Sequence, residues 1–124
     1  MNHKAHSIRA FIGAKNFEES RSFYTDLGFV ESKIDDHMSY FKIFDSLGFY
    51  LQNAFVEDWV NNTMLFLEVD DMHTYCKSLQ NLNLHQKYAS IKLTPIVERE
   101  WGRECFLHDP SGILWHFGEF KPVG

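Results

Sequence analysis

The chain has 124 residues, enough for one hydrophobic core and too few for two independent ones. Hydrophobic residues make up 44% and charged residues 23%, which argues against disorder, and a net charge of −5 without a run of Lys or Arg argues against a nucleic-acid partner. Aromatic residues are in excess, with 12 Phe, 5 Tyr and 3 Trp. We therefore ask whether some of these rings line a concave apolar binding site.

The first half of the chain predicts one strand, one helix and three further strands. Apolar and other residues alternate over 7–14, which is typical of a strand. Asn16 and Glu19 have the spacing of a capping box, and Gly28 suits the position after a helix end. Strand patterns follow at 29–34, 38–44 and 48–53, and we interpret 54–62 as a connector.

The second half repeats this order with a longer middle. A strand is predicted at 63–69, followed by a helix that Asp70 or Asp71 caps and that ends near Leu82. Strands are predicted at 91–98, 103–108 and 113–119, and the turn Asp109–Gly112 separates the last two. We expect a single domain over 1–124, made of two repeats at about 7–53 and 63–120.

The two halves can be aligned on each other. A shift of 55 residues places Phe11 on Phe66 and Asn16 on Asp71, and a shift of 64 places Leu51 on Trp115 near the end of each half. Such internal repetition points to a duplicated architecture. Chance similarity between two amphipathic strand–helix units is the alternative.

Three stretches of this sequence resemble the vicinal oxygen chelate superfamily, which includes glyoxalase I, extradiol dioxygenases and fosfomycin and bleomycin resistance proteins. The stretches are NFEESRSFYTDLGF (16–29), FLEVDDMHTYCKSL (66–79) and EWGRECFLHDPSGILWHF (100–117). The WGRE, DPSG and WHF elements of the last one look most like the bleomycin resistance branch. The resemblance implies an α+β fold of two βαβββ modules that form a cup-shaped sheet, and a homodimer.

Strand periodicity divides the aromatic residues between the two faces of that sheet. Phe17, Tyr24, Phe49, Trp115 and Phe117 are predicted to pack between helices and sheet. The opposite parity places other residues toward the cup, namely Phe11, Tyr50, Gln52, Phe66, Leu114 and His116.

The resemblance also supplies a test for a metal, because most enzymes of the superfamily hold a divalent ion with one side chain from each of four strands. The corresponding positions here are Arg9, Gln52, Met64 and His116. A guanidinium has no lone pair to donate, and a thioether is a poor ligand for a hard ion. We therefore expect no metal and no other cofactor. The bleomycin resistance branch likewise lacks the metal.

Tryptophans and charged residues complete the candidate site. Trp101 is placed in the ligand groove by the resemblance, and Trp59 in the connector is a weaker candidate. Arg9 requires an anionic partner, either Glu68 or a carboxylate or phosphate of the ligand. The predicted ligand-binding residues are Arg9, Phe11, Tyr50, Gln52, Trp59, Met64, Phe66, Trp101, Leu114 and His116.

Further polar residues near the WGRE turn have two interpretations each. Glu98, Glu100 and Glu104 are expected to be solvated, and the alternative is that they neutralise a cationic ligand. His108 and His116 come from neighbouring strands and could form an acid–base pair, or could be hydrogen-bonded wall residues.

The first functional hypothesis is a metal-independent protein that binds a small molecule, with an antibiotic of the bleomycin type as the ligand the resemblance implies. The alternative is a glyoxalase-like lyase or isomerase that works through His116. A third possibility is an interaction domain whose cup is filled by its own side chains. Cys76 and Cys105 are expected to be buried free thiols, and no apolar run reaches about 18 residues, so we expect a cytoplasmic protein without a membrane partner.

Overall fold

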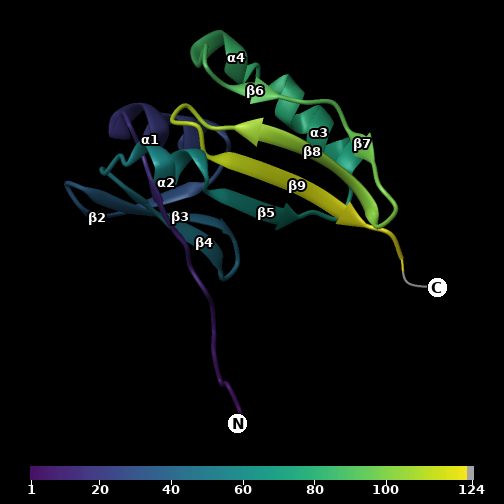
Figure 1. The fold of residues 1–124 in the computed structure, drawn as a ribbon, viewed down its shortest axis with the longest axis horizontal. Coiled ribbons are helices and arrows are strands. Elements are labelled where there is room, and N and C mark those ends of the chain that lie inside the picture. Colours follow the sequence, from purple (N-terminus) through teal and green to yellow (C-terminus); the bar gives the residue numbers. More distant parts are fainter. Residues whose placement is uncertain (123–124) are drawn as a thin grey trace.

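A computed structural model describes residues 1–122 of the chain (Figure 1). The first half contains β1 (Phe11–Gly13), α1 (Phe17–Asp26), β2 (Val30–Asp35), β3 (Met38–Phe44) and β4 (Leu47–Gln52). Its sheet has the order β1-β4-β3-β2, with β1 parallel to β4 and the other pairs antiparallel. The βαβββ order of the first half is therefore as predicted.

The second half is built on the same plan with additions. It contains β5 (Met64–Glu68), α3 (Met72–Asn81), α4 (Leu84–Lys87), β6 (Lys92–Leu93), β7 (Val97–Glu98), β8 (Gly102–His108) and β9 (Leu114–Phe120). Its sheet has the order β5-β9-β8-β6, and β7 pairs with β8. The fold is α+β, as predicted.

Three local predictions need correction. The strand expected at 91–98 is divided into β6 and β7, and Pro95, which has no N–H to donate to a ladder, lies in the gap. Two short helices were not predicted, α2 (Glu57–Asn61) in the connector and α4 after the second predicted helix. The strand expected from residue 7 begins at Phe11, because the last ladder bond runs from the Tyr50 N–H to the Ala10 carbonyl and earlier residues have no backbone partner on β4. Ile8 is accordingly 98% exposed, and the N-terminal segment extends away from the sheets (Figure 1).

Both helix starts are fixed by side-chain caps. Oδ1 of Asn16 accepts a hydrogen bond from the Glu19 N–H at 3.1 Å, and Oδ1 of Asp71 accepts one from the Thr74 N–H at 3.2 Å. Asp71 rather than Asp70 is thus the cap of α3. Gly28, with a φ of 101°, ends the first helical segment as predicted.

The core lies between the helices and one face of each sheet. Helix α1 packs on β2 and β4, and α3 packs on β8 and β9. The five rings predicted to pack there are all buried, and Cys76 and Cys105 are buried free thiols. Trp115 joins the two halves, because its ring centroid lies 5.4 Å from that of Phe49 and 5.9 Å from that of Tyr24. No helix among residues 1–122 is long and apolar enough to cross a membrane.

Candidate functional site

Each sheet has a face that its helices leave uncovered. On the first sheet this face carries Phe11, Tyr40, Lys42, Tyr50 and Gln52, and we name it the first open face. On the second sheet it carries Met64, Phe66, Phe106, Leu114, His116 and Phe120, with Trp101 beside it, and we name it the second open face. The parity predicted from the sequence is confirmed for six of these residues, namely Phe11, Tyr50, Gln52, Phe66, Leu114 and His116.

Arg9 lies over the first open face from the segment that precedes β1. Its Nη1 donates a hydrogen bond to the Tyr50 hydroxyl at 2.9 Å, and its guanidinium carbon is 4.3 Å from the centroid of Tyr40. Phe11 stacks on Tyr50 with a centroid distance of 4.7 Å and an interplanar angle of 18°. The hydrogen bond to Tyr50 raises the pKa of Arg9, so this cation is permanent.

The predicted partner of Arg9 within the chain is wrong. In the described part of the chain, Glu68 forms no ion pair with Arg9, and its side chain is exposed on β5 opposite Gly118. Aromatic contacts replace the expected carboxylate. They are sufficient because Arg9 is exposed and keeps its hydration on one side.

The second open face carries a cluster of three exposed rings. Trp101 lies 5.9 Å from Phe66 and 5.3 Å from Phe120 between centroids, and Phe66 and Phe120 are 5.6 Å apart. The exposed fractions are 37% for Trp101, 46% for Phe66 and 50% for Phe120. The Phe66 ring lies directly over Gly118, where any side chain would occupy the same space. These rings form an apolar surface that water contacts in the isolated chain.

His116 connects this surface to a buried carboxylate. Its Nδ1 is 3.2 Å from Oε1 of Glu104, and its Nε2 is 3.5 Å from the Met64 sulfur. Glu104 also accepts a hydrogen bond from Arg99 at 2.9 Å and is only 7% exposed. The expectation that Glu104 is solvated is therefore wrong. Its charge is balanced within the protein rather than offered to a ligand.

Of the two interpretations of His108 and His116, the acid–base pair is not found among the described residues, and His116 is a hydrogen-bonded wall residue. Phe106, not His108, lies opposite His116 on the neighbouring strand, and its ring packs edge-on against the imidazole at 4.8 Å. His108 lies opposite Leu114, two residues further along the strand pair. The structure therefore gives His116 a carboxylate neighbour and a thioether neighbour, but no second imidazole among the described residues.

The register of the repeat differs from the sequence alignment. Phe11 pairs with Tyr50 and Tyr40 pairs with Tyr50, while Phe66 pairs with His116 and Phe106 pairs with His116. Hence Tyr50 corresponds to His116, which is 66 rather than 64 residues later, and Tyr40 corresponds to Phe106. The counterpart of Gln52 is Gly118. The 64-residue shift that matched Gln52 with His116 is thus wrong by two residues.

The corrected register changes one of the four side chains at the metal-ligand positions, and the new set is still a poor set of metal ligands. The four equivalent positions are now Arg9, Tyr50, Met64 and His116, and only the imidazole is a good ligand for a divalent ion. A permanent cation at Arg9 would also repel the metal. Among residues 1–122, no three His, Cys, Asp or Glu side chains form a group that could hold one. This donor set does not fit the metal of the superfamily's enzymes.

The remaining candidates lie at the margins of the two faces. Trp59, 36% exposed, packs from α2 against Gly13, beside the half-buried Gln52, at one end of the first open face. Leu114 lies opposite Met64 at one end of the second. A cavity of about 450 Å³ is lined by residues of both halves, among them Arg9 and Phe66.

Sequence reasoning missed three rings of the site. Tyr40, Phe106 and Phe120 lie on the same sheet faces as the residues that were predicted to face the cup. Their strand parity was the signal that could have identified them. Tyr40 and Phe106 lie on strands whose register was not assigned. Phe120 lies one residue beyond the predicted end of its strand.

Comparison with known proteins shows a shared fold. No family model and no curated protein sequence matches this chain. Among solved structures it is similar to the bleomycin-binding protein from Streptomyces verticillus, complexed with copper(II)-bleomycin, with a TM-score of 0.81, 21% identity, and coverage of 97% of this chain and 100% of that one. The bleomycin resistance determinant of transposon Tn5 matches with a TM-score of 0.76 and 16% identity, over 95% of this chain and 100% of that one. A glyoxalase/bleomycin resistance protein/dioxygenase from Nocardioides matches with a TM-score of 0.72 and 16% identity, over 99% of this chain and 89% of that one.

These neighbours are proteins of the vicinal oxygen chelate superfamily, so the resemblance drawn from the sequence is confirmed for the fold. The identities are low, and the side chains of the two open faces must therefore be interpreted from their own chemistry.

Proposed function

We propose that this chain, which has the fold of the bleomycin-binding proteins, is a metal-independent protein that binds a small molecule without reacting with it. The observation that carries the proposal is the cluster of Phe66, Trp101 and Phe120 on the second open face. Exposed rings that are held in place by one another form a preorganised surface for a planar or apolar guest.

The energetics favour capture by stacking. Each of the three rings is between one third and one half exposed, so a guest laid on them removes further apolar surface from water. An aromatic pair contributes about 0.5–1.5 kcal/mol beyond the burial of its area. The rings already contact one another, so little side-chain entropy is lost when the ligand binds.

An antibiotic of the bleomycin type is the first ligand to test. The neighbour from Streptomyces verticillus is a bleomycin-binding protein complexed with copper(II)-bleomycin, and it matches over nearly the whole of both chains. The resemblance of the WGRE segment, which contains Trp101, supports the same choice. We further propose a cytoplasmic location and a single domain of two repeats, at about 7–53 and 63–120.

A homodimer would complete the site. The second open face leaves three large rings exposed in a single chain, and a second copy could form the opposite wall of a groove over them. Light scattering on the purified protein tests the assembly. A monomer that binds ligand with full affinity would contradict the need for a partner copy.

Tryptophan fluorescence tests the binding proposal. Trp115 is 2% exposed and should not respond to ligand, whereas Trp101 is 37% exposed and should be quenched when bleomycin is added. Trp101→Ala should remove most of the quenching and weaken binding by about tenfold, the factor that 1.4 kcal/mol represents. Phe55→Ala, which removes an exposed ring of the connector that belongs to neither open face, is the matched control.

Bleomycin that neither quenches Trp101 nor releases heat in calorimetry would contradict the bleomycin assignment. Binding that is unchanged in Trp101→Ala would contradict the proposed position of the site.

A lyase or isomerase of the glyoxalase kind is the second candidate, and one observation favours it. His116 has the Glu104 carboxylate at its Nδ1, an arrangement that can orient an imidazole for proton transfer. Turnover of the methylglyoxal–glutathione hemithioacetal, measured with and without added divalent metal, tests this candidate. Turnover that disappears in His116→Gln would favour the enzyme, and no turnover under either condition would exclude this reaction.

A further inference from the structure

Arg9, Phe11, Tyr40 and Tyr50 form a cation–aromatic cluster on the first open face, which we name the Arg9 cradle. Tyr40 supports one side of the guanidinium, Tyr50 accepts one of its hydrogen bonds, and Phe11 stacks on Tyr50 beside it. One N–H of Arg9 is thus engaged by a neutral hydroxyl. The other donors of its planar fork have no partner among the described residues.

The charge of Arg9 is exceptional in this chain. Of the four arginines, Arg21, Arg99 and Arg103 each form ion pairs with glutamates, and only Arg9 has no carboxylate partner in the described part of the chain. Strands β1, β3 and β4, which form the floor of the cradle, contain no Asp or Glu. Lys42 shares the outward parity of Tyr40 and adds a second cation to this face.

The corresponding place on the other sheet lacks this charge. There Met64 occupies the position of Arg9 and contacts His116 through its sulfur, as Arg9 contacts Tyr50. The second open face therefore provides aromatic stacking alone, with Glu104 already neutralised by Arg99. The chain thus has two aromatic surfaces of the same construction, and only one of them is cationic.

We infer that the Arg9 cradle is an anion subsite that receives a planar aromatic acid, its carboxylate or phosphate held by the guanidinium and its ring stacked on Phe11. This inference rests on the proposed small-molecule-binding function and assigns a ligand class to one part of the site. The guanidinium fork matches the two oxygens of a carboxylate or phosphate. Phe11 is 49% exposed, so its outer surface is available to the ring of the ligand.

A series of probes with one shape and different charges tests this inference. Calorimetric titration with 2-naphthoate, 2-naphthyl phosphate, neutral 2-naphthamide and cationic 2-naphthylmethylammonium compares charge at constant ring area. We expect the anions to bind at least about tenfold more tightly than the amide, with a preference that falls as salt rises. The stronger of the two anions identifies carboxylate or phosphate as the preferred group.

Substitutions assign that preference to the cradle. Arg9→Gln should reduce the affinity of the amide little and should make the anions and the amide bind equally. Arg9→Lys should keep part of the preference, because an ammonium retains the charge but not the planar fork. Lys77→Gln removes one exposed charge from α3, far from the cradle in the fold, and is the matched control. Arg9 is exposed, and thermal unfolding should confirm that the variants remain folded.

The inference is overturned if the amide or the ammonium binds as tightly as the anions, if no probe binds, or if Arg9→Gln retains the preference. It is also overturned if Arg9→Gln changes the oligomeric state and no anion preference exists, because Arg9 would then pair with a second copy. Bleomycin quenching of Trp101, measured in the Arg9→Gln variant, separates this result from the proposed function. Anion preference lost with Arg9 while bleomycin still quenches Trp101 supports both, and quenching without anion preference overturns this inference alone.

Discussion

The hydroxyl of Tyr24 donates a hydrogen bond to Oδ2 of Asp109 at 2.6 Å and accepts one from Nε1 of Trp115 at 2.9 Å. Tyr24 belongs to α1, and Asp109 begins the turn between β8 and β9, so the contact joins the two halves of the fold. The other oxygen of Asp109 accepts hydrogen bonds from three N–H groups of its own turn, those of Ser111, Gly112 and Ile113. Burial raises the pKa of Asp109, and the Tyr24 hydrogen bond opposes that shift.

Tyr24→Phe should lower the free energy of unfolding by about 3 kcal/mol, because it leaves Oδ2 of the buried Asp109 and the buried indole N–H of Trp115 each without a partner. Urea unfolding of the two proteins measures the difference. Tyr75→Phe is the control, since no side-chain hydrogen bond of Tyr75 is present among the described residues. Equal losses in the two variants would show that the network between the halves contributes nothing specific.

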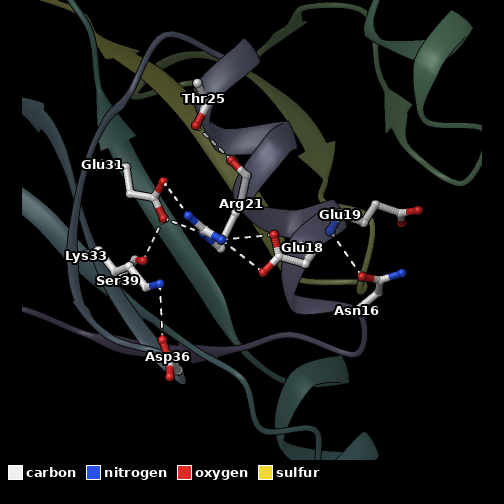
Figure 2. Close-up of polar contacts among 9 residues, drawn as sticks. All are labelled: Asn16, Glu18, Glu19, Arg21, Thr25, Glu31, Lys33, Asp36 and Ser39. Carbon is white, nitrogen blue, oxygen red and sulfur yellow. Dashed lines mark hydrogen bonds and ion pairs between the residues drawn. The ribbon is translucent and has the colours of Figure 1, made fainter.

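An acid-sensitive ion pair holds α1 against the first sheet. Arg21 donates to Glu31 at 2.6 Å, and Glu31 also accepts from the Ser39 hydroxyl at 2.6 Å (Figure 2). Arg21 contacts Glu18 as well, but the Glu18 side chain is 77% exposed, so solvent screens that pair. The Arg21 hydrogen bond, with a smaller contribution from Ser39, lowers the pKa of Glu31 from its usual value of 4.5.

The folded-state pKa of Glu31 lies below the unfolded-state value, so its stabilisation is complete above about pH 4.5 and is lost as the pH falls through the folded-state value. Glu31→Gln should cost about 1.5 kcal/mol at pH 7 and much less once the pH is below the folded-state pKa of Glu31. Urea unfolding at several pH values measures this difference. Glu57→Gln, at an exposed residue of α2, is the matched control. A cost for Glu31→Gln that is the same at both pH values would contradict the assignment.

The position of the Phe66 ring depends on Gly118. A Cβ at Gly118 would overlap the far end of that ring, so Gly118→Ala should displace it, at a cost of no more than about 1 kcal/mol because the half-exposed ring can turn toward solvent. In a Phe66→Ala background the same change should cost nothing, because the overlapping ring is absent. A double-mutant cycle by urea unfolding measures this coupling. An unchanged cost in that background would show that the strain arises elsewhere in β9.

Cys76 and Cys105 should be inert toward thiol reagents in the native protein. Burial and the neighbouring Cys76 raise the pKa of Cys105 to about 12, and the reactive thiolate is correspondingly rare. We expect both thiols to react with Ellman's reagent only after unfolding, at a rate set by the opening of α3 from β8. Cys76→Ser and Cys105→Ser assign any reaction to one sulfur. Rapid reaction in the native state would contradict the burial of these side chains.

Local features of this chain could be predicted from its sequence because their causes are local. Asn16 and Asp71 lie three residues before the N–H groups that they cap, and their polar side chains can be identified without the fold. The alternation that separates Phe49 and Trp115 from Tyr50 and His116 has a period of two along a strand. The core and the parity of the faces followed from such patterns, whereas the α+β class followed from the resemblance of three stretches to a known superfamily.

Strand register could not be predicted, because it is set by pairing between residues far apart in the chain. The alignment matched His116 with Gln52, and the structure matches it with Tyr50, two residues away. A shift of two residues leaves each side chain on the same face of its strand but changes its neighbours. The sequence by itself therefore determined which side chains face outward. Only the tertiary structure decided that Arg9 contacts Tyr40 and Tyr50 instead of Glu68, because backbone hydrogen bonds between distant strands determine which side chains are neighbours.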